Sequence, residues 1–389
     1  MAHYDPFAYD THENPYPLYR QLRDEAPAYY NEQLDFWALS RYEDVRNALI
    51  DHETYCSRYG FLLEDIGEIA LPMVLAMDPP DHTRVRGSIS RALTPRRVAA
   101  LEAPMRRRAR ALLDAIASAG RADIIADFAA RLPLSVISDL LCVPEPDREA
   151  LRGWADDMVY REDGVKGLPA RGVAAAAQII GYFDTMLQRR AAAPEDDLLS
   201  LLLAAKDRGE LTYPELLGFC FILIIAGNET TTKLIGNMTY QLSLHPQQRQ
   251  RLIDDPSLIP NAVEEVLRYE SSTHMMARTL TRDVQLHGRT MQKGKKVAVI
   301  LASANRDERY WVDPDTFDVG RDTAGTLALG IGIHHCLGAS LARLEAKVAL
   351  QEMLACIPDF AVETAGLERV HSGNVRGFSK VPITFTPSR

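Results

Sequence analysis

The sequence predicts a mainly α-helical protein with small β-sheets, folded as a single domain over residues 1–389. Seven segments carry apolar residues at three- and four-residue intervals, whereas only four short stretches are rich in β-branched residues. No Gly/Ser linker, internal repeat or block of like charges divides the chain. A hydrophobic content of 47% with 25% charged residues is typical of a chain that buries a large core.

The helical segments follow one another along most of the chain. Arg, Glu and Gln residues separate the apolar positions, which is the pattern of a helix with one buried face. We expect helices over residues 96–118, 127–141, 171–193, 212–244, 247–253, 261–270 and 338–356. Strands are expected where β-branched residues gather and partly alternate, over residues 36–40, 277–286, 295–303 and 381–387.

Charge and cysteine content exclude several classes of protein. Lys and Arg number 44 against 53 Asp and Glu, and the net charge of −9 argues against a chain that coats nucleic acid or an anionic membrane. The amino end lacks the features of a secretory signal, and the most apolar run, residues 216–227, is shorter than the ~20 residues of a membrane span. Five cysteines without a CxxC pair favour a reducing cytoplasm over a disulfide framework.

The segment LALGIGIHHCLG at residues 327–338 is the most informative part of the sequence. Gly330, Gly332 and Gly338 allow backbone conformations and close approaches that other residues resist. Cys336 stands just before a predicted helix, where free amide hydrogens and the helix dipole would stabilise a thiolate and lower its pKa. Such a thiolate can ligate iron, although an isolated cysteine in this position is more often a small core residue.

The pattern G-x-G-x-H-x-C-x-G resembles the haem-binding loop of the cytochrome P-450 family. The resemblance implies that Cys336 is the proximal ligand of haem b and that His334 binds a haem propionate. Thiolate ligation favours O–O cleavage. The family usually has Phe where this chain has Leu329, and His335 stands where an apolar residue is commoner. Both departures bear on the reduction potential, since the surroundings of the sulfur tune the iron.

The segment AGNETTT at residues 226–232 lies at the end of the apolar run. A threonine run in a helix commonly packs or bonds back to the carbonyl one turn earlier. The segment also resembles the oxygen-activation helix of the family. That resemblance implies that Thr230 opens the helical ladder near Ala226 to leave a groove for dioxygen, and that Glu229 relays protons. An acid beside an alcohol is what delivery of two protons requires.

The segment AVEEVLRYE at residues 262–270 places Glu265 and Arg268 three residues apart on one helix face. Such pairs are common on surfaces, but apolar neighbours indicate that this one is partly buried and in need of partners. It resembles the ExxR element of the family. The resemblance implies a structural network in which Arg321, from the irregular segment before the cysteine loop, is the third member. The proline that often follows this element is absent from residues 270–278.

The segment DPPDHTRVR at residues 78–86 places His82 and Arg86 on one face of a helix. An isolated pair of this kind usually faces solvent. In the family, the corresponding helix supplies cations to the haem propionates, so His82, Arg86, Arg278 and His334 would form that set. Charge-assisted hydrogen bonds to a carboxylate are strong, and arginine can make two of them. The four motifs occur in family order over residues 78–338.

These resemblances imply a bacterial-type haem-thiolate monooxygenase that uses dioxygen, two electrons and two protons to hydroxylate or epoxidise a small lipophilic substrate. The chain carries no flavin or nicotinamide fingerprint, so a ferredoxin with its reductase is the implied electron donor. We expect a cytoplasmic monomer without a membrane span or nucleic-acid partner. A haem-thiolate peroxygenase or isomerase, or a non-enzymatic haem sensor, would share Cys336 but would not need the acid and alcohol at Glu229 and Thr230.

Two surfaces follow from the same comparison with the family. The residues expected to line the substrate pocket are mostly apolar with a few polar tips, as in ligand cavities generally; they are Tyr59, Phe61, Leu62, Ile222, Met275, Met276 and Phe378. The ferredoxin is expected to dock on the cysteine side, on basic residues that could equally form a solvated helix face; they are Arg91, Arg96, Arg97, Arg106, Arg107, Arg108, Arg343 and Lys347.

Overall fold

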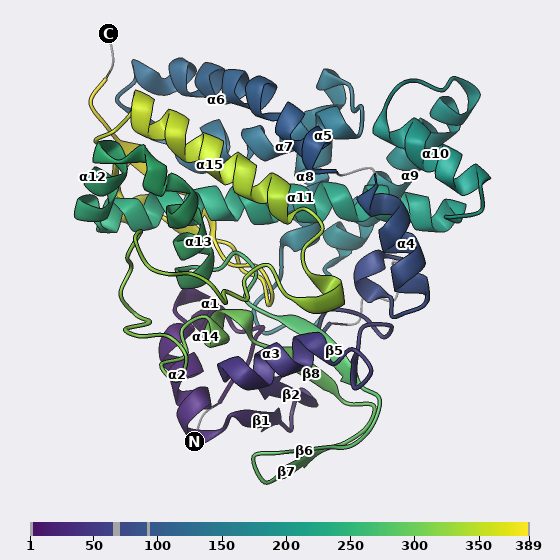
Figure 1. Cartoon of the computed structure of the whole chain (residues 1–389). Coiled ribbons are helices and arrows are strands. Elements are labelled where there is room, and N and C mark those ends of the chain that lie inside the picture. The colour runs from purple at the N-terminus through teal and green to yellow at the C-terminus, as the bar shows by residue number, and fades with distance from the viewer. Residues whose placement is uncertain (1–2, 65–70, 92–93, 388–389) are drawn as a thin grey trace.

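The computed structural model of the chain describes residues 3–64, 71–91 and 94–387. Helices fill the upper part of the molecule and the largest sheet lies below them (Figure 1). The long helix α11, Tyr213–Leu244, crosses the centre of the helical part. A capping box between Thr212 and Glu215 fixes its start. The predicted class, mainly helical with small sheets, is therefore confirmed.

Most of the predicted helices lie where their apolar periodicity places them. The helices that match a predicted segment closely are α9 (Ala170–Ala192), α11, α12 (Pro246–Asp254), α13 (Ile259–Tyr269) and α15 (Ala339–Cys356). The segment 96–118 is divided into α5 (Pro95–Ala100) and α6 (Glu102–Ala117). Pro104 accounts for the break, because proline lacks the N–H that would bond to the carbonyl of Ala100.

The segment 127–141 is likewise not one helix. It begins as a π-helical turn, η2 (Ile125–Ala129), and continues as α7 (Arg131–Leu140). Pro133 removes the N–H that would bond to the carbonyl of Ala129, and that carbonyl instead accepts a hydrogen bond from Thr232 of α11 at 3.2 Å. The sequence analysis did not predict α2 (Tyr16–Glu25), α3 (Tyr42–Ile50), α8 (Arg148–Val159) or α10 (Leu198–Asp207). The helix that carries His82 is α4 (Asp81–Ser90).

The five-stranded sheet has the order β1-β2-β8-β5-β3, with β2 and β8 parallel and the other pairs antiparallel. Its strands are β1 (Ala28–Asn31), β2 (Phe36–Leu39), β8 (Lys296–Val299), β5 (Met276–Leu280) and β3 (Tyr55–Cys56). The predicted strand 277–286 is interrupted after β5 and resumes as β6 (Val284–Leu286), which forms a hairpin with β7 (Arg289–Met291). The predicted strand 295–303 ends at Val299, and residues Leu301–Ala304 form the short helix α14.

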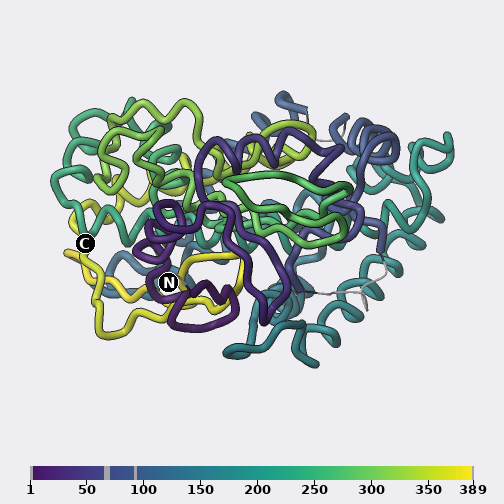
Figure 2. The backbone as a smooth tube through the Cα atoms, turned by 90° about the horizontal axis from the view of Figure 1, so that it is seen from below, coloured from purple at the N-terminus to yellow at the C-terminus, as the bar shows by residue number. Residues whose placement is uncertain are grey.

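The carboxyl-terminal strands form two smaller sheets. These are β4-β12-β9 (Arg121–Asp123, Pro382–Thr384, Ala361–Val362) and β10-β11 (Glu368–Arg369, Phe378–Lys380). In Figure 2 the amino-terminal segment runs beside the carboxyl-terminal loop, and Arg376 donates a hydrogen bond to the carbonyl of His12 there. Two segments far apart in sequence therefore close one end of the molecule together.

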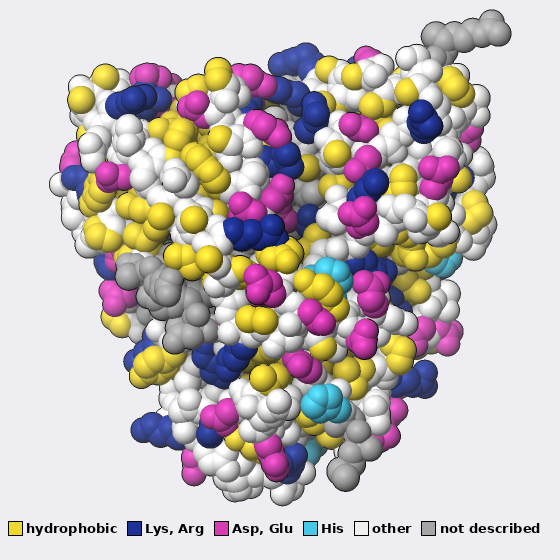
Figure 3. All heavy atoms as spheres, turned by 180° about the vertical axis from the view of Figure 1, so that it is seen from behind, with side chains coloured by type: hydrophobic (Ala, Val, Ile, Leu, Met, Phe, Trp, Pro, Cys, Tyr) yellow, Lys and Arg dark blue, Asp and Glu magenta, His cyan; other side chains and the backbone are white. Residues whose placement is uncertain are grey.

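The hydrophobic core surrounds α11, whose Ile235, Met238 and Leu242 are fully buried. Among the described helices, only α11 has the length and apolar composition of a membrane span, and 67% of that stretch is buried inside the protein. It therefore packs as a central core helix. On the face shown in Figure 3, acidic and basic side chains are interspersed rather than gathered into a patch of one sign.

Candidate active site

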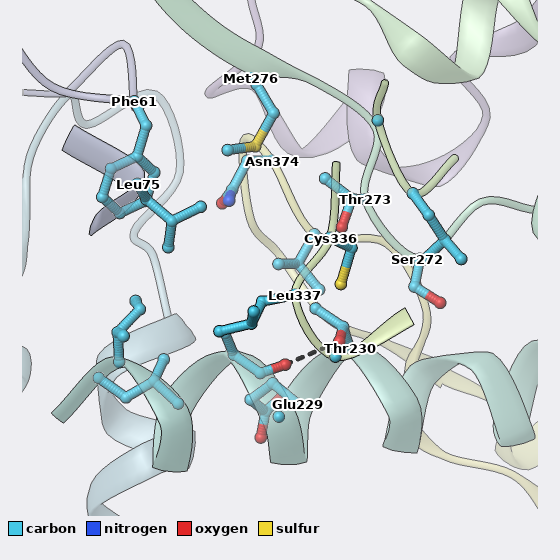
Figure 4. Close-up of a pocket in the computed structure, with 18 of the residues that line it drawn as sticks. Phe61, Leu75, Glu229, Thr230, Ser272, Thr273, Met276, Cys336, Leu337 and Asn374 are labelled. Carbon is cyan, nitrogen blue, oxygen red and sulfur yellow. Dashed lines mark hydrogen bonds between the residues drawn. The ribbon is translucent and has the colours of Figure 1, made fainter. Parts of the chain in front are cut away.

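A cavity of about 330 Å³ lies between α11 and the segment that leads into α15. Cys336, Thr230 and Glu229 all line it, and Figure 4 shows Cys336 together with the two α11 residues around the same space. The structure thus brings the motif at residues 226–232 and the cysteine loop, which are about 100 positions apart in sequence, to one site. Its volume lies in the usual range of small-molecule pockets.

The cysteine loop is held by a tight turn of its backbone. Gly330 and Gly332 have φ angles of 66° and 70°, a region that favours glycine, and the N–H of Cys336 donates to the carbonyl of Leu329 at 2.8 Å. Gly338 differs from the expectation, since its φ is −85°. A Cβ built on Gly338 meets no protein atom within 4 Å, although the residue lines the cavity. A side chain at this position would therefore extend into space that holds no protein atoms.

Burial dominates the chemistry of the free Cys336 thiol. It raises the pKa of Cys336 above its ordinary value, against the opposing effects of the Gly338 N–H, Arg86 and Arg343. The expectation of a lowered pKa is therefore wrong for the unligated side chain, because α15 begins only at Ala339 and desolvation outweighs its amides. A metal ion changes this balance, since a coordinating thiol is deprotonated outright.

Four basic side chains gather on the cysteine side of the cavity, as the sequence analysis expected. His82 and Arg278 are 2% and 3% exposed, and the rings of His82 and His334 lie 4.4 Å apart between centroids. Arg86 donates to the carbonyl of His335 at 2.5 Å, and the one acceptor of Arg278 among the described residues is the carbonyl of Ala277 at 2.8 Å. Within residues 3–64, 71–91 and 94–387, neither arginine forms an ion pair.

The electrostatics of this cluster favour a bound anion. Burial lowers the pKa of Arg278 to about 10, and burial together with Arg278 and His82 lowers the pKa of His334 to about 3. Both ring nitrogens of His82 are buried without a hydrogen-bond partner in the described protein. Uncompensated buried cations and orphaned donors are costly unless an anion meets them. A planar cofactor with carboxylates at one edge and a metal that takes a thiolate fits these residues.

Thr230 lies on the cavity side of α11, one turn after Ala226. Its hydroxyl donates to the carbonyl of Ala226 at 2.8 Å, the bond drawn in Figure 4. Helix α11 is continuous from Tyr213 to Leu244, so the expected opening of the helical ladder is not present. This is the hydrogen bond to the preceding turn that threonine often makes within a helix, and its acceptor is a carbonyl on the cavity side.

Glu229 is 3% exposed and forms an ion pair with Lys233 at 3.2 Å. Lys233 was not anticipated from the sequence, although a spacing of four residues places it on the same helix face as Glu229. Asp156 of α8 was not anticipated either. Partial burial and the nearby Glu229 raise the pKa of Asp156 to about 7, and Arg152 donates to this half-exposed carboxyl at 2.8 Å. Asp156 is therefore close enough to interact electrostatically with Glu229, and its carboxyl reaches the surface.

Glu265, Arg268 and Arg321 meet in one buried network. Arg268 donates two hydrogen bonds to Glu265, at 2.7 and 2.8 Å, and both side chains are fully buried. Arg321 lies 3.3 Å from the same carboxylate. Arg268 also donates to the carbonyls of Asn305, Pro314 and Thr316, so the network ties α13 to the irregular segment before the cysteine loop.

The predicted pocket residues divide into two groups. Phe61, Leu62, Ile222 and Met276 line the cavity, whereas Tyr59, Met275 and Phe378 do not. Tyr59 is 64% exposed. Met275 precedes Met276 in an extended segment, where neighbouring side chains point to opposite faces, and it accepts a weak hydrogen bond from Tyr4.

Phe378 is 1% exposed and packs against Tyr240 in the main core, with ring centroids 4.9 Å apart. Several lining residues were not anticipated, because they come from segments that carry no periodic pattern; they are Met73, Val74, Leu75, Thr273 and Asn374.

The predicted docking cations are mostly neutralised. Five of them each form an ion pair with a glutamate; they are Arg91, Arg106, Arg108, Arg343 and Lys347. Arg107 of α6 is exposed and forms no ion pair within the described part of the chain. Helix α6 packs beside α15, which begins at the cysteine loop (Figure 1). The acidic partners weaken the positive field that the sequence alone implies.

Comparison with known proteins agrees with this geometry. The sequence model of the cytochrome P450 family matches residues 171–368. The chain is 42% identical to the putative cytochrome P450 123 of Mycobacterium tuberculosis, over 98% of this chain and 96% of that protein. It is 39% identical to the vitamin D(3) 25-hydroxylase of Pseudonocardia autotrophica, over 99% and 97%. The structure of CYP109E1 from Bacillus megaterium in complex with testosterone matches with a TM-score of 0.90 and 32% identity, over 97% and 99%.

Proposed function

The chain belongs to the cytochrome P450 family, and from this premise we propose that it is a haem-thiolate monooxygenase of lipophilic organic substrates. Proteins of this family bind haem b through a cysteine thiolate. The proposed reaction is RH + O₂ + 2 e⁻ + 2 H⁺ → ROH + H₂O, in which a C–H bond becomes a C–OH bond and the second oxygen atom leaves as water. Epoxidation of a C=C bond has the same balance of electrons and protons.

The observation that carries this proposal is the pair of arginines beside Cys336, Arg86 and Arg278, that form no ion pair within the described residues. We assign Cys336 Sγ as the ligand of the haem iron, and Arg86, Arg278, His82 and His334 as the groups that bind the propionates. When bound, the haem supplies dioxygen binding and activation. The protein then has three tasks: to orient the substrate, to control water and to deliver protons.

We assign proton delivery to Thr230 and Glu229. The Thr230 hydroxyl donates to Ala226 in the resting arrangement, and rotation about its side-chain torsion turns the same O–H into the cavity. Glu229 stands beside it and is held by Lys233. Asp156, with its pKa near 7, supplies protons from the surface side at physiological pH. Glu265, Arg268 and Arg321 contribute structure rather than chemistry.

Electrons are proposed to come from a ferredoxin that is reduced by its own reductase, and the protein is proposed to act as a cytoplasmic monomer comprising one catalytic unit over residues 1–389. All five cysteines are free, which suits a reducing compartment. The exposed Arg107 belongs to α6, which packs beside α15, the helix that follows the cysteine loop, so an acidic redox partner bound to α6 would come within reach of the haem.

Turnover experiments distinguish this activity from its rivals. The holoenzyme is supplied with a lipophilic substrate, a ferredoxin, its reductase and oxygen, and in parallel with hydrogen peroxide alone. A monooxygenase forms oxygenated product in the first arm, with two electrons consumed for each product molecule. Product with peroxide alone would identify a peroxygenase. Carbon monoxide binding without any oxidation, accompanied by a change in affinity for a partner protein, would identify a sensor.

A further inference from the structure

Asn374 places a hydrogen-bond donor in a mostly apolar part of the cavity. It belongs to the loop between β10 and β11, and in Figure 4 its amide extends into the cavity from the side opposite Thr230. Phe61, Leu75, Met276 and Thr273 are labelled on that side. Polar groups of this kind fix the orientation of a ligand, while the apolar wall supplies most of the binding energy.

The hydrogen bonds of the loop determine which end of the amide faces the cavity. Ser372 Oγ accepts the N–H of Val375 at 3.3 Å and donates to Asn374 Oδ1 at 3.1 Å. Because Ser372 already accepts a backbone N–H, its own proton is available for the amide oxygen. The amide nitrogen is therefore turned away from Ser372. It has no hydrogen-bond partner in the described protein.

The loop that carries Asn374 is rigidly attached. The carbonyl of Asn374 accepts the N–H of His274 at 2.8 Å, and the N–H of Arg376 donates to the carbonyl of Ser272 at 2.8 Å. The Arg376 guanidinium bonds to the buried Glu270 at 2.7 Å. A donor held in this way is preorganised, so little conformational entropy is lost when a ligand accepts its hydrogen bond.

The charge around this donor is balanced. Arg161 also lines the cavity, but it is paired with the buried Glu64 at 3.0 Å. The unpaired arginines Arg86 and Arg278, with the histidines His82 and His334, belong to the proposed propionate set on the cysteine side. The subsite at Asn374 therefore suits an uncharged acceptor and not a carboxylate or an ammonium group.

We propose that Asn374 is the specificity anchor of the substrate site. Its Nδ2–H donates to an uncharged oxygen, a carbonyl or a hydroxyl, at the end of a lipophilic substrate remote from the carbon that is oxidised. This inference rests on the proposed monooxygenase function. A ligand that lacks the oxygen covers the amide N–H without pairing it, and a site built around such a donor rejects that ligand.

Matched pairs of ligands test the anchor in the holoenzyme. The pairs are testosterone and its 3-deoxy analogue, 2-decalone and decalin, and 4-phenylcyclohexanone and phenylcyclohexane. Dissociation constants are measured by calorimetry and by the change in haem absorption on binding. In wild type, at least one ketone should bind about tenfold more tightly than its hydrocarbon partner, because the ketone forms one neutral hydrogen bond that the hydrocarbon cannot form.

Three variants locate the effect. Asn374→Leu removes the donor with little change in volume and should bring the ratio between ketone and hydrocarbon affinity close to one. Ser372→Ala keeps the donor but releases the amide, and should reduce the ratio partly. Thr273→Val removes a different hydroxyl from the same cavity and should leave the ratio unchanged.

Equal affinity for both members of every pair in wild type would overturn the proposal, as would a failure of every ketone to bind to haem-loaded protein. A ratio that survives in Asn374→Leu would also overturn it. Each of these results leaves the monooxygenase proposal standing, because that proposal fails only if the protein takes up no haem or does not oxidise any lipophilic compound.

Discussion

Replacement of Arg278 by methionine should have opposite effects on the protein without and with its cofactor. Arg278 is 3% exposed and forms no ion pair within the described residues. Burial lowers its pKa from 12.5 to about 10, which at about 1.36 kcal/mol per pKa unit is a cost of roughly 3 kcal/mol to the folded apoprotein. The side chain is charged at pH 7 in both the folded and the unfolded chain, so this cost is fully present there and disappears only as the pH rises through 10 to 12.5.

Arg278→Met should therefore raise the free energy of unfolding of haem-extracted protein by about 1 to 3 kcal/mol in urea titrations at pH 7. In the holoenzyme the same change removes a charge-assisted hydrogen bond to a propionate, worth about 1.5–3 kcal/mol, so haem transfer to an acceptor protein should be at least about tenfold faster. Arg376→Met is the matched control. Arg376 is similarly buried but pairs with Glu270 at 2.7 Å, and its loss should destabilise the apoprotein by about 3–5 kcal/mol.

A loss of apoprotein stability in Arg278→Met comparable to that in Arg376→Met would refute this reasoning, because it would show that the protein itself compensates the charge. Unchanged haem retention would refute the second half, because Arg278 would then make no contact with the cofactor. The two measurements are independent, so each half of the account can fail separately.

Three further predictions concern protons and electrons. Thr230→Ala should leave reductant consumption nearly unchanged while hydrogen peroxide replaces organic product, because the hydroxyl that guides protons is lost. In wild type, product formation should fall above about pH 7, because the raised pKa of Asp156 keeps that acid protonated below this value. Asp156→Asn should abolish this fall. Charge reversal at Arg107 and Arg108 should slow reduction by an acidic ferredoxin by about tenfold at low salt, and less at high salt.

Each of these predictions has a control and an outcome that contradicts it. Product yield per electron measures the first, and an unchanged yield in Thr230→Ala removes Thr230 from proton delivery. A pH profile that is the same in Asp156→Asn and wild type assigns the limb to another group. Arg20→Glu reverses an exposed charge on α2, far from α6 in Figure 1, and should leave the reduction rate unchanged. Equal rates in Arg20→Glu and the Arg107/Arg108 variant would place the docking surface elsewhere.

The sequence predicted best the features that depend on local residue order. Cys336 with its glycines, Glu265 with Arg268, and Glu229 with Thr230 are each contained in one short motif, and periodicity located the helices that carry two of those motifs. Arg321 was anticipated from the resemblance to the family, and the structure places it 3.3 Å from Glu265. The pairing of Glu265 with Arg268 follows from helix geometry, in which residues three and four apart share a face.

Features that depend on the packing of distant segments were not predictable. Met275 and Met276 are neighbours of similar chemistry, and only the phase of the strand decides which one faces the cavity. Phe378 has the composition of a pocket residue but packs into the core against Tyr240. Asp156 and Asn374 have no motif around them, and their roles are visible only once α8 and the carboxyl-terminal loop are placed against α11.

The ferrous–carbon monoxide difference spectrum of wild type and Cys336→Ser tests the assignment of the sulfur ligand most directly. We predict that wild-type protein shows the red-shifted Soret band that thiolate ligation produces, and that Cys336→Ser lacks this band at equal haem content. A band typical of imidazole ligation in wild type, unchanged in Cys336→Ser, would contradict the assignment of Cys336 and every role that depends on it.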